Sequence, residues 1–311
     1  MTKYVVSGYI GFDNFGDELI AKILVQKLKS LKAEKITLIS SKPEVTKKLY
    51  DVESCSMFGF LKSLVETDIL ISGGGSLLQD ATSLKSLIYY LGVIFCALIF
   101  RKKVIIFAQG IGPINSKIGR FLTKIILKKA NEITVRDVKS KELLESWEIE
   151  SKVVKDPVFE LELKPKNVKN IVGIQLRDCK QIQENPIFLK NLAQQIAEKF
   201  KTQEIHIISL HDSYDKDICH QFALYLKESG IQKVKIFENL SLDSAINCLS
   251  ELEYLVAMRF HANVIGIKSK VKVAAINYDP KVEKLSKEYG IPLIEIESDN
   301  LGEMFEKLLN S

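Results

Sequence analysis

Residues 68–76 read DILISGGGS, a short apolar run that ends in three consecutive glycines. Other short runs rich in valine and isoleucine recur along the chain and alternate with longer stretches of helical period. Such alternation is typical of a parallel sheet that is covered by helices on both faces. The stretch therefore predicts one strand of an open α/β sheet, followed by a loop that leads into a helix.

The predicted strands form two series. The first comprises 3–7, 35–40, 68–72, 104–108 and 132–136, with a short strand at 152–154. The second comprises 171–176, 204–210, 233–237, 254–257 and 272–277. Between them, residues 156–169 (DPVFELELKPKNVK) contain two prolines and no clear period, which predicts a linker. We therefore expect two Rossmann-like domains, 1–157 and 158–311, that face a cleft in a glycosyltransferase-B-like fold.

The bulk composition agrees with a globular protein of two domains. The chain has 311 residues, of which 46% are hydrophobic and 27% charged. Its net charge of +5 comes from lysines that we interpret as scattered, so nucleic-acid binding receives little support. An anionic small substrate and an anionic membrane surface fit this charge equally well. The five cysteines lie far apart and form no CxxC pair, which favours a reducing cytoplasm over a disulfide framework.

One apolar run raises the question of membrane contact. Residues 87–100 form 14 consecutive positions without a charge, fewer than the roughly 20 that span a bilayer, and Arg101, Lys102 and Lys103 follow. The sequence begins directly with a strand, which predicts no signal peptide. A buried core helix is the favoured interpretation of the run. A peripheral contact with the inner membrane leaflet is the alternative.

Glycine-rich loops follow three strands of the first series. They read GYIGFDNFGDE at 8–18, SGGGS at 72–76 and QGIGP at 109–113. Glycine permits positive φ, and the helix N-terminus that follows offers unpaired N–H groups, so such loops either hold an anion or only turn the chain. The triple glycine favours a functional role, because glycines bury no side chain. The candidate loop residues are Gly11, Asp13, Asn14, Gly16, Asp17, Gly73, Gly74, Gly75, Asp80 and Gln109.

Cationic side chains end strands in both series. Arg136 precedes Asp137, and it either pairs with this neighbour or points at a carboxylate or phosphate. Arg259 and His261 lie at the carboxyl end of a strand beside a helix N-terminus, where both can meet an anion. Lys281, at the end of the next strand, can reach the same point. Three such cations would suit a small ligand with several negative charges.

His211 also follows a strand, and it is succeeded by three aspartates within six residues. The spacing does not match a metal-binding motif, so a loop role or a substrate contact is favoured over a metal ligand. We predict no metal site.

Together, these segments resemble the bacterial polysaccharide pyruvyl transferases. The resemblance rests on GYxGxxNxGDE, SGGGSLLQD, QGIGP, VRD, DPVF, MRFHA and YDPKV, in this order between residues 8 and 282. It implies a glycosyltransferase-B-like fold, phosphoenolpyruvate as donor, and a pyruvate ketal that bridges two hydroxyls of a sugar in a cell-surface polysaccharide. The chain departs from the family at 269–272 (SKVK), where relatives tend to have a Gly-x-Pro turn.

The resemblance also implies roles for individual residues. The donor-binding residues of the family correspond to Arg136, Arg259, His261 and Lys281. We assign Arg259 and Lys281 to the anion, and His261 to phosphate contact or proton transfer. We regard Asp13, Asp17 and Asp80 as candidates for hydroxyl contacts or for the base, and Asp17 is the one grouped with Arg259 and His261 as catalytic.

The expected partners are phosphoenolpyruvate and a sugar or lipid-linked glycan acceptor, without a metal or redox cofactor. The acceptor is expected on residues 1–157 and the donor on residues 158–311. One alternative is a nucleotide-sugar glycosyltransferase on the same fold, since a fold does not fix a function. A non-catalytic sugar-binding protein is the other alternative, and the intact basic residues count against it.

Overall fold

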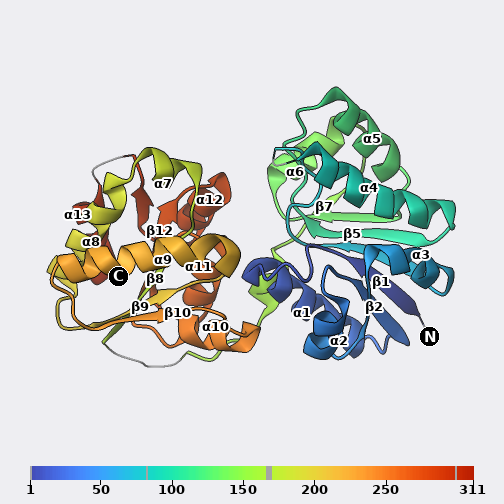
Figure 1. Cartoon of the computed structure of the whole chain (residues 1–311). Coiled ribbons are helices and arrows are strands. Elements are labelled where there is room, and N and C mark those ends of the chain that lie inside the picture. The colour runs from blue at the N-terminus through green and yellow to red at the C-terminus, as the bar shows by residue number, and fades with distance from the viewer. Residues whose placement is uncertain (1, 82, 166–169, 298–299) are drawn as a thin grey trace. The chain divides into compact units, whose positions relative to one another are not determined.

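The computed structural model describes residues 2–81, 83–165, 170–297 and 300–311. The chain divides into two compact units, Met1–Leu161 and Glu162–Ser311 (Figure 1). Each unit is an open α/β domain in which every pair of neighbouring strands is parallel. The two-domain parallel architecture predicted from the sequence is therefore confirmed.

The first domain has a sheet whose described strands run in the order β3-β2-β1-β4-β5-β6-β7. These strands are β1 (Lys3–Ser7), β2 (Lys35–Ile39), β3 (Glu53–Cys55), β4 (Ile69–Gly73), β5 (Lys103–Gln109), β6 (Glu132–Val135) and β7 (Lys152–Val153). One face is covered by α1 (Phe15–Ser30) and α2 (Pro43–Tyr50). The other face is covered by α3 (Met57–Val65), α4 (Leu84–Ile99), α5 (Lys117–Leu127) and α6 (Val138–Glu145) (Figure 1). The order reverses between β1 and β4, so the loops after these two strands lie side by side.

The segment expected to begin the linker belongs to the first domain. A short 3-10 helix, η1 (Pro157–Glu160), packs against α1, and Val158 is fully buried. Glu160 forms an ion pair with Lys27 of α1 at 3.1 Å. Because its apolar residues are buried, this segment is part of the fold, and the first unit extends four residues beyond the boundary expected after residue 157. Residues 166–169 of the predicted linker lie outside the described residues.

The second domain repeats the architecture with the described strands in the order β10-β9-β8-β11-β12-β13. The strands are β8 (Ile171–Gln175), β9 (Glu204–Ile208), β10 (Val234–Phe237), β11 (Tyr254–Ala257), β12 (Lys272–Asn277) and β13 (Leu293–Glu295). The helices are α7 (Lys180–Glu184), α8 (Ile187–Lys199), α9 (Asp212–Glu228), α10 (Leu242–Ser250), α11 (Phe260–Lys268), α12 (Pro280–Tyr289) and α13 (Leu301–Leu309). The main core lies between the sheet and α8, α9 and α13.

The apolar run at 87–100 forms most of α4, but it is not the buried core helix that we expected. Leu87, Leu91 and Ile94 are buried against the sheet, whereas Phe95 and Ile99 are 52% and 60% exposed. The helix is apolar on both its inner and its outer side, which the run alone could not reveal. In the described part of the chain, no helix is long and apolar enough to cross a membrane.

Candidate active site

The three glycine-rich loops meet at the carboxyl edge of the first sheet. The N–H of Gly74 donates to the carbonyl of Phe107 at 2.9 Å, and that of Gly110 donates to the carbonyl of Gly75 at 2.9 Å. These bonds extend the pairing of β4 and β5 beyond the strands, so the loops at 72–76 and 109–113 form one continuous ledge.

The triple glycine packs directly against α1. Gly74 has φ +58°, and a Cβ atom there would lie 2.2 Å from Cγ2 of Ile20. Gly75 has φ +68°, and its Cβ would lie 2.6 Å from Oδ1 of Asp17. The expectation that these glycines contribute nothing to packing is therefore wrong, because their missing side chains allow the helix to approach the loop.

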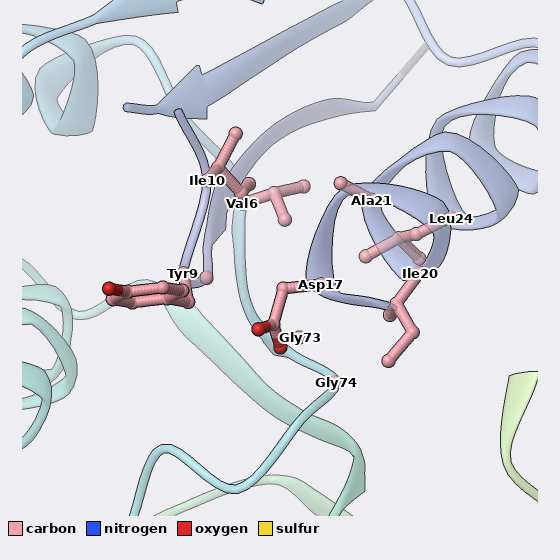
Figure 2. Close-up of a pocket in the computed structure, with 10 residues that line it drawn as sticks. Val6, Tyr9, Ile10, Asp17, Ile20, Ala21, Leu24, Gly73 and Gly74 are labelled. Carbon is pink, nitrogen blue, oxygen red and sulfur yellow. The ribbon is translucent and has the colours of Figure 1, made fainter. Parts of the chain in front are cut away.

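A small pocket of about 10 Å³, enough for one water molecule, lies where the loops of this ledge meet the first loop (Figure 2). Its walls come from Tyr9 and Ile10 after β1, from Asp17 and Ile20 of α1, and from the glycines after Ile71. The Asp17 carboxylate points toward Gly73 and Gly74 in Figure 2. Most of the lining is apolar, so Asp17 supplies the carboxylate of an otherwise hydrophobic wall.

The remaining residues of the first loop hold its backbone. Asn14 is the N-cap of α1 and accepts from the N–H of Gly16 at 3.1 Å. Asp13 has φ +58° and forms an exposed ion pair with Lys42. Gly11 donates its N–H to Oε1 of Glu18 at 2.7 Å. These contacts hold the shape of the turn through groups of the chain itself.

Glu18 is a buried acid that the sequence interpretation passed over. It is 8% exposed and also accepts a short hydrogen bond from the Tyr50 hydroxyl. Burial raises its pKa above the ordinary 4.5, although the bonds from Tyr50 and Gly11 oppose this effect. The pair Asp17-Glu18 indicated a helix N-terminus, but no pattern distinguished the acid that turns inward from its neighbour.

Asp80 and Gln109 also stabilise the loops at the carboxyl edge of the first sheet. Both oxygens of Asp80 accept backbone N–H groups, from Asn115 at 2.6 Å and from Ser116 at 2.8 Å. These bonds lower the pKa of Asp80. Gln109 is fully buried and donates to the Ser72 hydroxyl at 2.8 Å.

Arg136 pairs with a residue that the sequence did not suggest. Its Nη1 donates to Oδ2 of Asp156 at 2.9 Å, and its Nη2 donates to the Ser76 hydroxyl at 2.8 Å. Asp137 instead caps α6 by accepting from the N–H of Ser140 at 2.7 Å. Of the two interpretations left open for Arg136, the pair with Asp137 is therefore excluded. Arg136 joins the glycine ledge to the start of η1.

In the second domain, Arg259 lies at the carboxyl edge of the sheet as the N-cap residue of α11. Its Nε and Nη2 donate to the two oxygens of Asp215 at 2.6 and 2.7 Å. The Asp215 side chain is fully buried and that of Arg259 is 11% exposed. The backbone N–H of Arg259 donates to Oε1 of Gln175 at 2.8 Å. Asp215 thus fixes the guanidinium, and Gln175 fixes the backbone of the same residue.

His261 and Lys281 lie in the first turns of neighbouring helices. His261 is half-buried in α11, and its ring meets that of Phe260 edge-on at 5.2 Å. Lys281 belongs to α12, and its Nζ lies 3.4 Å from Oδ2 of Asp279. Since α11 and α12 pack together after adjacent parallel strands, both cations lie at the same sheet edge as Arg259.

Arg177 is a fourth cation at this edge, and the sequence interpretation missed it. It lies two residues beyond β8, whose last residue Gln175 pairs with Ala257 of β11, so it is level with Arg259 on the adjacent strand. Its guanidinium lies 5.2 Å from the centroid of the Tyr278 ring. Burial lowers the pKa of Arg177, but Tyr278 and Asp215 outweigh this and raise it overall. The signal was available, because Leu-Arg-Asp at 176–178 repeats the Val-Arg-Asp pattern at Arg136.

The His211 segment does not form a ligand set. His211 precedes α9 and is 6% exposed, with its ring 4.6 Å from that of Tyr214. Asp215 is taken by Arg259, and Asp212 accepts from the backbone of Asn239 at 2.7 Å. Within 2–81, 83–165, 170–297 and 300–311, no three His, Cys, Asp or Glu residues are grouped to hold a metal ion.

Two parallel α/β domains with polar residues at the carboxyl edges define a glycosyltransferase-B-like enzyme fold, and solved structures share it. The UDP-GlcNAc 2-epimerase of Methanocaldococcus jannaschii is 15% identical, with a TM-score of 0.69 over 100% of this chain and 93% of that chain. A putative epimerase of this type from Listeria monocytogenes is 12% identical, with a TM-score of 0.67 over 100% and 89%. A glycosyltransferase from Rickettsia africae is 16% identical, with a TM-score of 0.63 over 99% and 88%.

The family model for polysaccharide pyruvyl transferase matches residues 14–280. The chain therefore belongs to the polysaccharide pyruvyl transferase family. Arg136, Arg259 and His261 lie inside the matched segment, and Lys281 follows it directly. No protein with a curated functional description matches the sequence significantly.

Proposed function

We propose that the protein transfers a pyruvyl group from phosphoenolpyruvate to two hydroxyls of a sugar, in a cell-surface polysaccharide or its lipid-linked precursor. The observation that carries this proposal is the set of cations at the carboxyl edge of the second sheet: Arg177, Arg259, His261 and Lys281. Phosphoenolpyruvate carries a phosphate and a carboxylate, and planar guanidinium groups bind such pairs of oxygens well.

The reaction assigns a task to each group. A proton adds to the methylene carbon of the enol, the first sugar hydroxyl attacks the adjacent carbon and loses its proton, and the second hydroxyl replaces phosphate and loses its own. The products are a pyruvate ketal and inorganic phosphate. Arg177, Arg259 and Lys281 neutralise the donor, and His261 contacts phosphate or transfers the proton. Asp17 is the candidate base for an acceptor hydroxyl, because its carboxylate lines the pocket of the first domain.

Phosphate release from phosphoenolpyruvate, measured against a panel of lipid-linked disaccharides, tests the proposal. We expect release with one acceptor class and loss of turnover in His261→Ala. Arg177→Ala should weaken donor binding in a calorimetric titration, because a charge-assisted hydrogen bond contributes about 1.5–3 kcal/mol. Arg101→Ala, on the surface of the first domain, is the matched control and should bind the donor normally.

A nucleotide-sugar transferase is the second candidate, because the similar structures include a glycosyltransferase. The same titration with UDP separates the two. Tight binding of UDP together with no binding of phosphoenolpyruvate would reject the pyruvyl transfer. We also propose that the reaction takes place in the cytoplasm, because the five cysteines lie far apart in the sequence and form no CxxC pair.

A further inference from the structure

Exposed apolar side chains gather on three helices that cover the same side of the first sheet, α3, α4 and α5 (Figure 1). We call this surface the apolar face. Phe58 of α3 is 95% exposed, and Phe121 of α5 is 64% exposed. The apolar face comprises Phe58, Leu61, Val65, Ile88, Phe95, Ile99, Ile118, Phe121 and Ile125. The three helices adjoin, because α4 packs against α5 and Lys102, which follows α4, donates to the Val65 carbonyl of α3 at 3.2 Å. Single exposed apolar residues are ordinary, but a group on adjoining helices marks an interaction surface.

The spacing of these residues is that of an outward helical stripe. In α4, Ile88, Phe95 and Ile99 follow one another at intervals of seven and four. In α5, Ile118, Phe121 and Ile125 follow at intervals of three and four. Each helix therefore has an apolar stripe toward solvent in addition to the one that it buries. Both helices keep their core contacts when the outer stripe meets a partner.

Positive charge accompanies the apolar face. From residue 81 to residue 131 the sequence contains no Asp or Glu, and its cations are Lys85, Arg101, Lys102, Lys103, Lys117, Arg120, Lys124, Lys128 and Lys129. The whole chain carries +5, so these nine charges leave −4 for the rest. The interpretation of the lysines as scattered is wrong for this segment. On α5, Lys117 and Lys124 lie next to the exposed stripe.

The combination of exposed apolar side chains and positive charge favours a membrane over a second copy of the chain as the partner of the apolar face. In a symmetric contact between two copies, the same surface would face itself, so its lysines would approach each other. The buried centre of protein interfaces is also depleted in lysine. An anionic bilayer instead offers acyl chains to apolar side chains and phosphates to the surrounding cations. Long lysine side chains reach the headgroups while their stems remain in the apolar layer.

We propose that the apolar face lies on the surface of an anionic membrane. Phe58, Phe95 and Phe121 enter the boundary between headgroups and acyl chains, and the cations from 101–103 and α5 contact phosphate groups. The proposal rests on this surface and not on the proposed reaction. If the acceptor is lipid-linked, the same contact holds the enzyme at the layer that carries its substrate.

Flotation of the full chain with vesicles tests the proposal. We expect recovery with anionic phosphatidylglycerol vesicles and little recovery with neutral phosphatidylcholine vesicles. High salt should weaken the recovery with phosphatidylglycerol, because salt screens the charges. Phe58→Glu and Phe121→Glu should prevent flotation, and because both side chains are exposed the variants should fold. Leu224→Glu on α9, whose side chain is 58% exposed, is the matched control and should float normally.

The charges have a separate test. Lys117→Gln and Lys124→Gln should each weaken vesicle binding roughly fivefold. Lys227→Gln, on the exposed surface of the second domain, should not. Equal recovery with neutral and anionic vesicles would overturn the proposal. A second result would also overturn it: wild-type protein that binds no vesicles and sediments as a dimer, which Phe121→Glu converts to a monomer. In that case a second copy of the chain would cover the apolar face.

Discussion

Arg259 and Asp215 form a two-point ion pair at the end of β11, with the carboxylate fully buried and the arginine nearly so. The pair uses Nε and Nη2 of the guanidinium, so Nη1 takes no part in it. Asp215 thus positions a cation that the family resemblance assigns to the donor. A buried arginine with a fixed orientation loses little freedom when it binds an anion.

The pair can be tested through stability. Asp215→Ala leaves the Arg259 charge buried without its partner, so the free energy of unfolding should fall by about 3–5 kcal/mol in a urea titration. The double variant Asp215→Leu with Arg259→Met removes both charges and should recover most of this loss. It should nevertheless bind no phosphoenolpyruvate. A double variant as unstable as Asp215→Ala would contradict the prediction.

The positions of the strands could be predicted from the sequence far better than the pairing of the side chains. Valine and isoleucine runs predicted the central strands, because a strand buried on both faces is apolar throughout. β3 and β13 were missed, since each has three residues and is partly exposed. Such short edge strands carry little pattern, although the shorter edge strand β7 was predicted from its neighbouring valines.

The ion-pair partners of the arginines could not be predicted from the sequence, because they depend on which side chains of a helix face the sheet. Arg259 pairs with Asp215, 44 positions earlier in the chain, although the sequence showed Asp215 only as one of three aspartates that follow His211. Arg136 pairs with Asp156 rather than with its neighbour. The strand ends predicted where the cations lie, and the tertiary fold determined which carboxylates they meet.

The glycine ledge makes a prediction with a matched control. Gly74→Ala should reduce the free energy of unfolding, because left-handed backbone costs about 1–2 kcal/mol in other residues. The overlap with Ile20 should cost a further 1–3 kcal/mol, roughly the penalty of overpacking. Gly92→Ala in α4 has open space around its Cβ and should raise stability by up to about 1 kcal/mol. Equal effects at the two glycines in urea unfolding would exclude this explanation.

Arg136 and Asp156 should be strongly coupled. Asp156 is 4% exposed, so Arg136→Met leaves a buried carboxylate without its charged partner and should destabilise by about 3–5 kcal/mol. In an Asp156→Asn background the same change should cost much less. The exposed pair Lys47 and Glu53 is the control, and its coupling should be about 0–1 kcal/mol. Similar coupling energies from both double-mutant cycles would refute a structural role for Arg136.

Glu18 predicts a pH dependence of known sign. Burial raises its folded pKa above 4.5, so folding binds a proton, and the stabilising contribution of Glu18 is complete below pH 4.5 and is lost as the pH rises through the folded pKa. The side chain of the Glu18→Gln variant does not titrate. The free energy of unfolding of this variant should therefore rise relative to that of wild type as the pH rises through this range, and the difference should then become constant. Glu66, whose pKa the hydrogen bond from Lys35 lowers, is the opposite case. The contribution of Glu66 to stability is lost as the pH falls below 4.5. As the pH rises, the free energy of unfolding of Glu66→Gln should therefore decrease relative to that of wild type. Urea unfolding at a series of pH values measures both differences, and a Glu18→Gln difference that stays constant with pH would rule out a raised pKa.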